Sequence, residues 1–61
     1  MDYKINWENE NGKQCCLVRQ TRVQANKIFE QLCQAYGTLS ATLLERDDNH
    51  DCIVDFYERG F

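Results

Sequence analysis

The sequence predicts an α+β fold in which two β-hairpins flank one helix, giving a four-stranded, mostly antiparallel sheet with the helix on one face. Three observations support this fold class. An Asn-Gly pair divides the N-terminal third, apolar residues recur at helical spacing in the middle, and a polar turn divides the last third. We expect one small domain with strands at about 2–9 and 13–20, a helix at about 22–36, and strands at about 38–46 and 51–58.

The first hairpin is predicted from Asn11-Gly12, the preferred central pair of a two-residue type I′ turn. With that turn, Trp7 faces Cys16 across the hairpin. Since strand side chains alternate between faces, the apolar residues that share the face under the helix are Tyr3, Ile5, Trp7, Cys16 and Val18. Cys15 and Leu17 are then expected on the uncovered face.

The helix is predicted between two capping signals. Thr21 and Gln24 have the spacing of an N-terminal capping box, and Gly37 stands where a C-terminal cap favours a left-handed residue. Between them a single apolar stripe at helical spacing comprises Ala25, Ile28, Phe29, Leu32 and Tyr36. We expect this stripe to pack against the sheet.

The second hairpin is predicted to turn at Asp48-Asn49, and a four-residue loop from Asp47 to His50 gives the same facing pairs. Leu44 then faces Ile53, with Tyr57 farther along the same face. This face is the one that the helix does not cover, whereas Leu43, Val54 and Phe56 are expected beneath the helix.

The uncovered face is the most informative surface, because a single helix covers only one side of the sheet. Its apolar residues are predicted to be Cys15, Leu17, Leu44, Ile53 and Tyr57. A contiguous apolar group indicates an interface, whereas scattered residues reflect the β-propensity of a half-exposed sheet. The leading hypothesis is a small, non-enzymatic protein-interaction module that forms a homodimer or docks on another protein through this face or an edge strand.

The charged residues suggest two alternative functions. Ten acidic and seven scattered basic residues give a net charge of −3, so nucleic acid is not the favoured partner. The first alternative is an acidic inhibitor or nucleic-acid mimic of the phage or mobile-element type, which requires one continuous patch of Glu8, Glu10, Glu45, Asp47, Asp48, Asp51 and Asp55. The second is weak RNA or single-strand binding on the sheet by Tyr57 with Lys4, Arg19 and Arg46.

The four cysteines do not predict a metal or catalytic site. Cys15 and Cys16 are adjacent strand residues whose thiols diverge, and no C-x-x-C pair is present. Cys16 and Cys52 are expected inside and Cys33 lies near a helix C-terminus, where the helix dipole opposes a thiolate. We therefore expect no metal, no cofactor and no catalytic residue.

The length of the chain and its N-terminal segment bear on catalysis and on location. A domain of 61 residues buries only about 60% of the surface that its unfolded chain exposes, which leaves few residues for the walls of an active site. The segment MDYKINWE is charged and has no apolar run, so we expect no membrane association and a cytoplasmic protein with free thiols. The layout resembles that of many short bacterial and phage proteins, a likeness of architecture alone.

Overall fold

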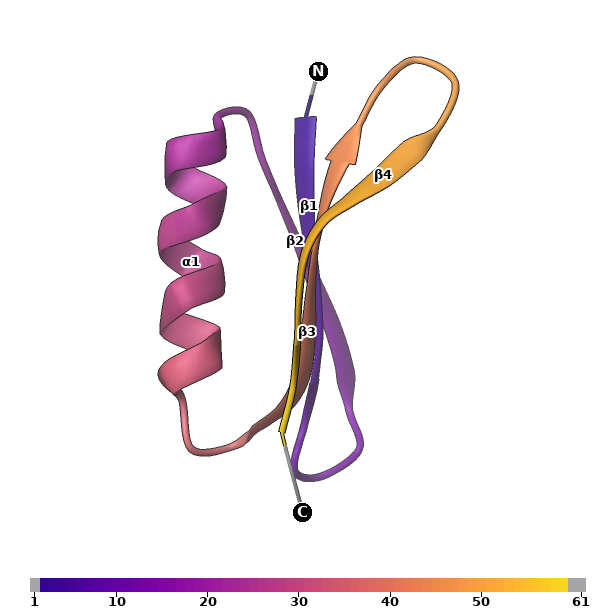
Figure 1. Cartoon of the computed structure of the whole chain (residues 1–61). Coiled ribbons are helices and arrows are strands. Elements are labelled where there is room, and N and C mark those ends of the chain that lie inside the picture. The colour runs from indigo at the N-terminus through magenta and orange to yellow at the C-terminus, as the bar shows by residue number, and fades with distance from the viewer. Residues whose placement is uncertain (1, 60–61) are drawn as a thin grey trace.

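The computed structural model describes residues 2–59 of the 61-residue chain. Its elements are β1 (Asp2–Asn9), β2 (Gln14–Arg19), α1 (Arg22–Gln34), β3 (Thr38–Arg46) and β4 (Asp51–Glu58). The strands pair antiparallel in the order β2-β1-β3-β4, and α1 lies along one face of this sheet (Figure 1). The predicted α+β fold class, hairpin-helix-hairpin, is confirmed.

The turn of the first hairpin differs from the predicted one. A type I′ turn needs positive φ at both central residues, and within residues 2–59 no residue other than glycine has positive φ. Gly12, at φ 80°, donates its N–H to the Asn9 carbonyl at 2.9 Å, and the Asn9 N–H donates to the Lys13 carbonyl at 3.0 Å. This is a type I turn followed by a glycine bulge, with three loop residues instead of two.

The longer turn changes the register by one residue. Trp7 pairs with Cys15, not Cys16, and Ile5 pairs with Leu17. A slip of one residue moves every side chain of a strand to the other face. Cys15 and Leu17 therefore lie on the helix side, and Cys16 and Val18 on the uncovered side, the reverse of the prediction.

The second hairpin agrees with the prediction near its turn and departs from it farther on. Leu44 pairs with Ile53 as expected, but a bulge follows and Leu43 pairs with Asp55. Val54 is the extra residue, so Ala41 pairs with Tyr57 and Tyr57 packs against the core. Phe56 points to the uncovered side, so the predicted places of Phe56 and Tyr57 are exchanged.

Helix α1 begins as expected and ends earlier. The Thr21 hydroxyl accepts the Gln24 N–H at 3.3 Å, which is the bond of an N-cap. The cap at the other end is Ala35, in extended conformation, and not Gly37. Tyr36, predicted as the last residue of the apolar stripe, lies beyond the helix and is 83% exposed.

The loop between α1 and β3 is held from two sides. The Glu10 N–H, in the first turn, donates to the Gly37 carbonyl at 2.8 Å. From the other side, Arg59 donates from Nη1 to the Tyr36 carbonyl at 2.7 Å, and its guanidinium lies 4.8 Å from the centre of the Tyr36 ring. The first turn and the residue after β4 therefore fix the same loop.

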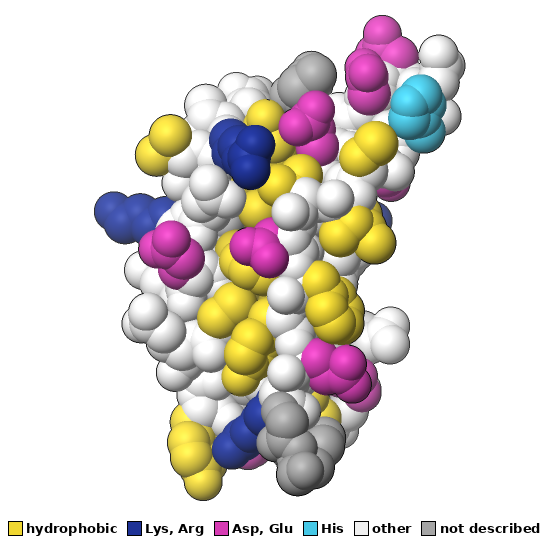
Figure 2. Space-filling model, in the orientation of Figure 1, with side chains coloured by type: hydrophobic (Ala, Val, Ile, Leu, Met, Phe, Trp, Pro, Cys, Tyr) yellow, Lys and Arg dark blue, Asp and Glu magenta, His cyan; other side chains and the backbone are white. Residues whose placement is uncertain are grey.

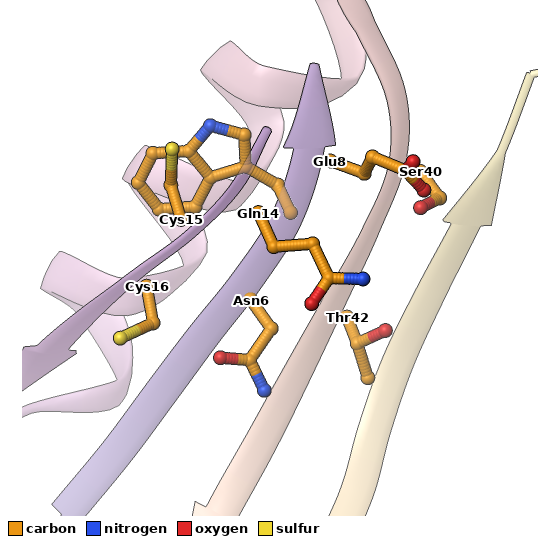
Figure 3. Close-up of a pocket in the computed structure, with 8 residues that line it drawn as sticks. Asn6, Glu8, Gln14, Cys15, Cys16, Ser40 and Thr42 are labelled. Carbon is orange, nitrogen blue, oxygen red and sulfur yellow. The ribbon is translucent and has the colours of Figure 1, made fainter. Parts of the chain in front are cut away.

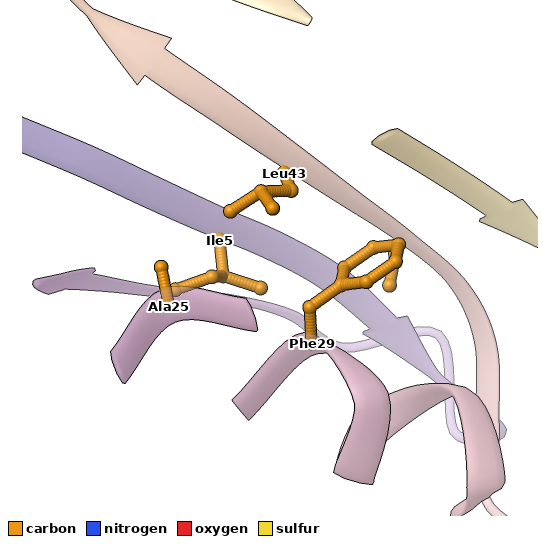
Figure 4. Close-up of a cluster of buried hydrophobic side chains, with 5 residues drawn as sticks. Ile5, Ala25, Phe29 and Leu43 are labelled. Atoms are coloured by element: carbon orange, nitrogen blue, oxygen red, sulfur yellow. The ribbon is translucent and has the colours of Figure 1, made fainter. Parts of the chain in front are cut away.

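The core lies between α1 and the two central strands. The helix packs mainly on β3 and β1 and less on β2. The buried apolar residues are Ile5, Ala25, Phe29, Ala41 and Leu43, of which Figure 4 labels four. This central position explains why the buried strand residues within residues 2–59 are all on β1 and β3, while both edge strands remain partly open.

Leu43 and Leu44 are neighbours on opposite faces and provide a test of this core. Leu43 is fully buried, so Leu43→Ala should lower the free energy of unfolding by about 2–5 kcal/mol. Leu44 is only half-buried, so Leu44→Ala should cost clearly less. Urea denaturation of both variants at low protein concentration measures the difference, and equal losses would contradict the assignment of faces.

Substitution of Gly12 tests the conformation of the first turn. A side chain at this position meets no atom within 4 Å, so the cost of Gly12→Ala comes from its positive φ alone. We expect a loss of roughly 1–2 kcal/mol in the free energy of unfolding for alanine. Gly12→Asn should lose less, because asparagine adopts left-handed backbone more readily. In a type I′ turn, Asn11 would also have positive φ. Substitution of Asn11 by alanine would then destabilise the protein as much as substitution of Gly12.

Candidate interaction surface on the uncovered sheet face

An apolar patch lies on the uncovered face and consists of Leu44, Ile53 and Phe56. Leu44 and Ile53 are directly paired, and the bulge at Val54 makes Ile53 and Phe56 successive residues on that face of β4. Ile53 is 68% exposed and Phe56 is 55% exposed. No described helix or strand packs over this side of the sheet (Figure 1), so the patch faces solvent.

A second apolar group lies at the opposite margin of the same face, on β2. It consists of Val18, which is 42% exposed, and the exposed Cys16. Lys4 stands between Val18 and Leu44 in the pairing, and Asn6 stands between Cys16 and Thr42. The uncovered face is therefore apolar toward both edge strands and polar along its centre.

The polar part of the face is hollowed. The hollow has a volume of about 510 Å³. Its lining consists of the uncovered-face residues Asn6, Glu8, Gln14, Cys16, Ser40 and Thr42, together with Trp7 and Cys15, whose strand positions belong to the helix side. In Figure 3, the side chains of Asn6, Gln14 and Thr42 project on the same side of the strands, with the helix behind the sheet. Glu8 is the one carboxylate in this lining, so the hollow chiefly offers hydrogen-bonding groups to a docked surface.

The predicted interaction residues are divided between the two faces. Leu44 and Ile53 lie on the uncovered face, as expected. Cys15, Leu17 and Tyr57 lie on the helix side, and Leu17 and Tyr57 pack against the core. Their places on the uncovered face are taken by Cys16, Val18 and Phe56.

One sequence signal could have identified the correct turn. Asn9 and Gly12 occupy the first and fourth positions of the turn, where a type I turn favours asparagine and glycine. The Asn9 side chain also accepts the N–H groups of Asn11 at 3.0 Å and Lys13 at 3.1 Å. Phe56 had no such signal, because its direction depends on the bulge at Val54.

The acidic residues do not lie together. Asp47, Asp48 and Asp51 are at the β3–β4 turn, and Glu10 is in the β1–β2 turn at the other end of a molecule 35 Å long. Glu45 and Asp55 pair with residues on the helix side, while Glu8 is on the uncovered face. Figure 2 likewise shows separated acidic side chains, with one group at the tip beside the histidine.

The residues expected to bind RNA are also separated. Tyr57 and Arg19 are on the helix side, whereas Lys4 and Arg46 are on the uncovered face. Arg46 is paired with Asp51 at 3.7 Å. Arg19 shares a face with Tyr57 but lies on the opposite edge strand, so the sheet does not bring the predicted aromatic residue together with the predicted basic side chains.

The four cysteines are free thiols in separate environments. Cys16 and Cys52 are exposed, which corrects the expectation that both lie inside, and Cys15 and Cys33 are half-buried. Burial raises the pKa of the Cys33 thiol, and the carboxylates of Asp55 and Glu30 raise it further. Within residues 2–59, no three side chains of histidine, cysteine, aspartate or glutamate are placed to hold a metal ion.

Alkylation by iodoacetamide near neutral pH tests the cysteine environments. Cys16 and Cys52 should react first because they are exposed, and Cys33 last because its raised pKa leaves little thiolate. Asp55→Asn should speed the reaction at Cys33, because it removes a charge that raises this pKa. Asp51→Asn is the matched control, and an equal effect of both variants on Cys33 would contradict the assignment.

Among the described residues, no helix combines the length and the hydrophobicity that crossing a membrane requires. No protein-family model, curated protein or solved structure matches the chain.

Proposed function

We propose that this chain is a small, non-enzymatic protein-interaction module that docks on a protein partner, a second copy or a different protein, through its uncovered sheet face. The observation that carries the proposal is the exposure of Ile53 and Phe56 in one patch with Leu44. Burying one such side chain completely is worth about 1.5–3 kcal/mol. A partner that covers the patch therefore gains binding free energy that the chain does not gain alone.

The surroundings of the patch support a docking role. Lys4, Asn6 and Thr42 provide polar groups beside it, and interfaces commonly combine an apolar centre with a polar rim. The nearby hollow offers amide and hydroxyl groups in place of paired acids and bases, which favours binding over catalysis. The acidic-inhibitor and RNA-binding alternatives have less support, because their residues are divided between faces and ends.

The test compares three proteins: the wild type, the double variant Ile53→Asp/Phe56→Asp, and Val23→Asp. Val23 is 78% exposed on α1, so Val23→Asp introduces the same kind of change away from the sheet. Solution mass is measured by light scattering over a range of concentrations, and circular dichroism checks that each variant is folded. For association of two copies through the patch, we expect the double variant to weaken binding by roughly tenfold or more, and Val23→Asp to leave it unchanged.

Docking on a different protein is tested with the same variants. A photoreactive amino acid at Thr42 is used to cross-link partners in cells, since Thr42 adjoins Phe56 in the pairing. The proposal expects a defined adduct with the wild type and with Val23→Asp, and its loss in the double variant. Equal masses and equal adducts for all three proteins would contradict docking through the patch.

A further inference from the structure

The two edge strands of the sheet differ in how they are protected. β4 carries Asp51, Asp55 and Glu58 and is bulged at Val54, which are features that prevent an edge from pairing with another strand. β2 is regular and contains no proline and no glycine, and its charged residue, Arg19, stands at its end, after the uncharged run Gln14–Val18. β2 is therefore the edge that is open to a further strand.

The direction of the backbone groups of β2 follows from the first turn. The Asn9 N–H donates to the Lys13 carbonyl, so this pair is hydrogen-bonded. Hydrogen-bonded and non-bonded pairs alternate along an antiparallel ladder, so Cys15 and Leu17 bond to β1. The N–H and C=O groups that point away from the sheet are those of Gln14, Cys16 and Val18. The Val18 carbonyl accepts a bond from Nη1 of the exposed Arg19 side chain at 2.8 Å, and a pairing strand has to replace this bond.

We propose that a second copy of this chain pairs its β2 with this β2, antiparallel about a two-fold axis, to form one continuous eight-stranded sheet. Residues with outward groups must then stand opposite residues with outward groups. Those residues lie on the uncovered face in both copies, so the axis is perpendicular to the sheet. Both helices consequently lie on the same side of the joined sheet.

Charge and packing favour a second copy as the occupant of this edge. The chain has a net charge of −3, yet β2 contains no acidic residue, so two copies meet where their acidic groups are absent. Pairing centred on Leu17 places Leu17 against Leu17 and Cys16 against Val18. It also keeps Lys13 away from Arg19 of the second copy, whereas a centre at Cys16 would place them opposite each other.

Helix α1 covers β2 only partly, so it leaves space for a second copy beside this strand. Because α1 packs mainly on β3 and β1, Leu17 and Cys15 at the margin are only half-buried. In the dimer centred on Leu17, Leu17 of one copy would be covered by Leu17 of the other, and Cys15 would be covered by Arg19. The inference goes beyond the proposed function, because it uses a strand edge and leaves the Leu44, Ile53 and Phe56 patches free on one side of the dimer.

Backbone amide exchange, followed by NMR alongside the solution mass, tests the pairing directly. In the monomer, the amides of Cys16 and Val18 should exchange fast and that of Leu17 slowly. At concentrations where the mass is that of a dimer, exchange at Cys16 and Val18 should slow by roughly tenfold or more, because these amides become hydrogen-bonded. Fast exchange at both residues in a dimer overturns the inference.

Two variants at Cys16 distinguish a role of its backbone N–H in the dimer from a role of its thiol. Cys16→Pro removes an N–H that β1 does not use, and proline is tolerated at an edge where the N–H faces solvent. Cys16→Ser keeps the N–H and removes the thiol. We expect Cys16→Ser to form the dimer and Cys16→Pro to lose it; a dimer that survives Cys16→Pro overturns the inference, and if Cys16→Pro is unfolded, the exchange data decide.

The outcomes also separate this inference from the proposed function. A dimer that is lost in Ile53→Asp/Phe56→Asp but kept in Cys16→Pro overturns the edge pairing and supports docking through the patch. A wild type that is monomeric at every concentration overturns the edge pairing, and the cross-linking experiment at Thr42 then decides the proposed function by itself.

Discussion

The backbone conformation of Gly12 is the constraint on which both faces and the free edge of β2 depend. Its positive φ closes a three-residue turn, and the turn sets the phase of β2 against β1. That phase decides which side chains lie under the helix and which backbone groups point away from the sheet. The burial of Leu17, the exposure of Val18 and the free edge of β2 therefore share one local cause.

The second constraint is that one helix of 13 residues accompanies a sheet of four strands. The helix buries the centre of one face, where Ile5 and Leu43 lie, and does not reach far enough to enclose the edge strands. The apolar side chains at both margins are thus a direct result of the proportions of the fold. Within residues 2–59, no second helix or further strand covers those margins.

The sequence predicted the fold class because its strongest signals are local. The Asn11-Gly12 pair located a turn, Thr21 located the helix start, and the pairing of Leu44 with Ile53 followed from the second turn. The faces were less predictable, because a turn one residue longer reverses a whole strand. The bulge at Val54 and the strand order are set by packing between distant segments, so no local pattern indicated that Phe56 is exposed.

The loop after α1 gives the molecule a property that its separate hairpins lack. The first turn bonds to Gly37 and the residue after β4 bonds to Tyr36 and Leu39, so both hairpins are anchored at one point between the helix and β3. The N–H groups of Glu10 and Arg59 and the Arg59 guanidinium therefore have their hydrogen-bond acceptors in this segment. Loss of order at this junction therefore loosens the first turn and the end of β4 together, which is the behaviour of a single cooperative unit.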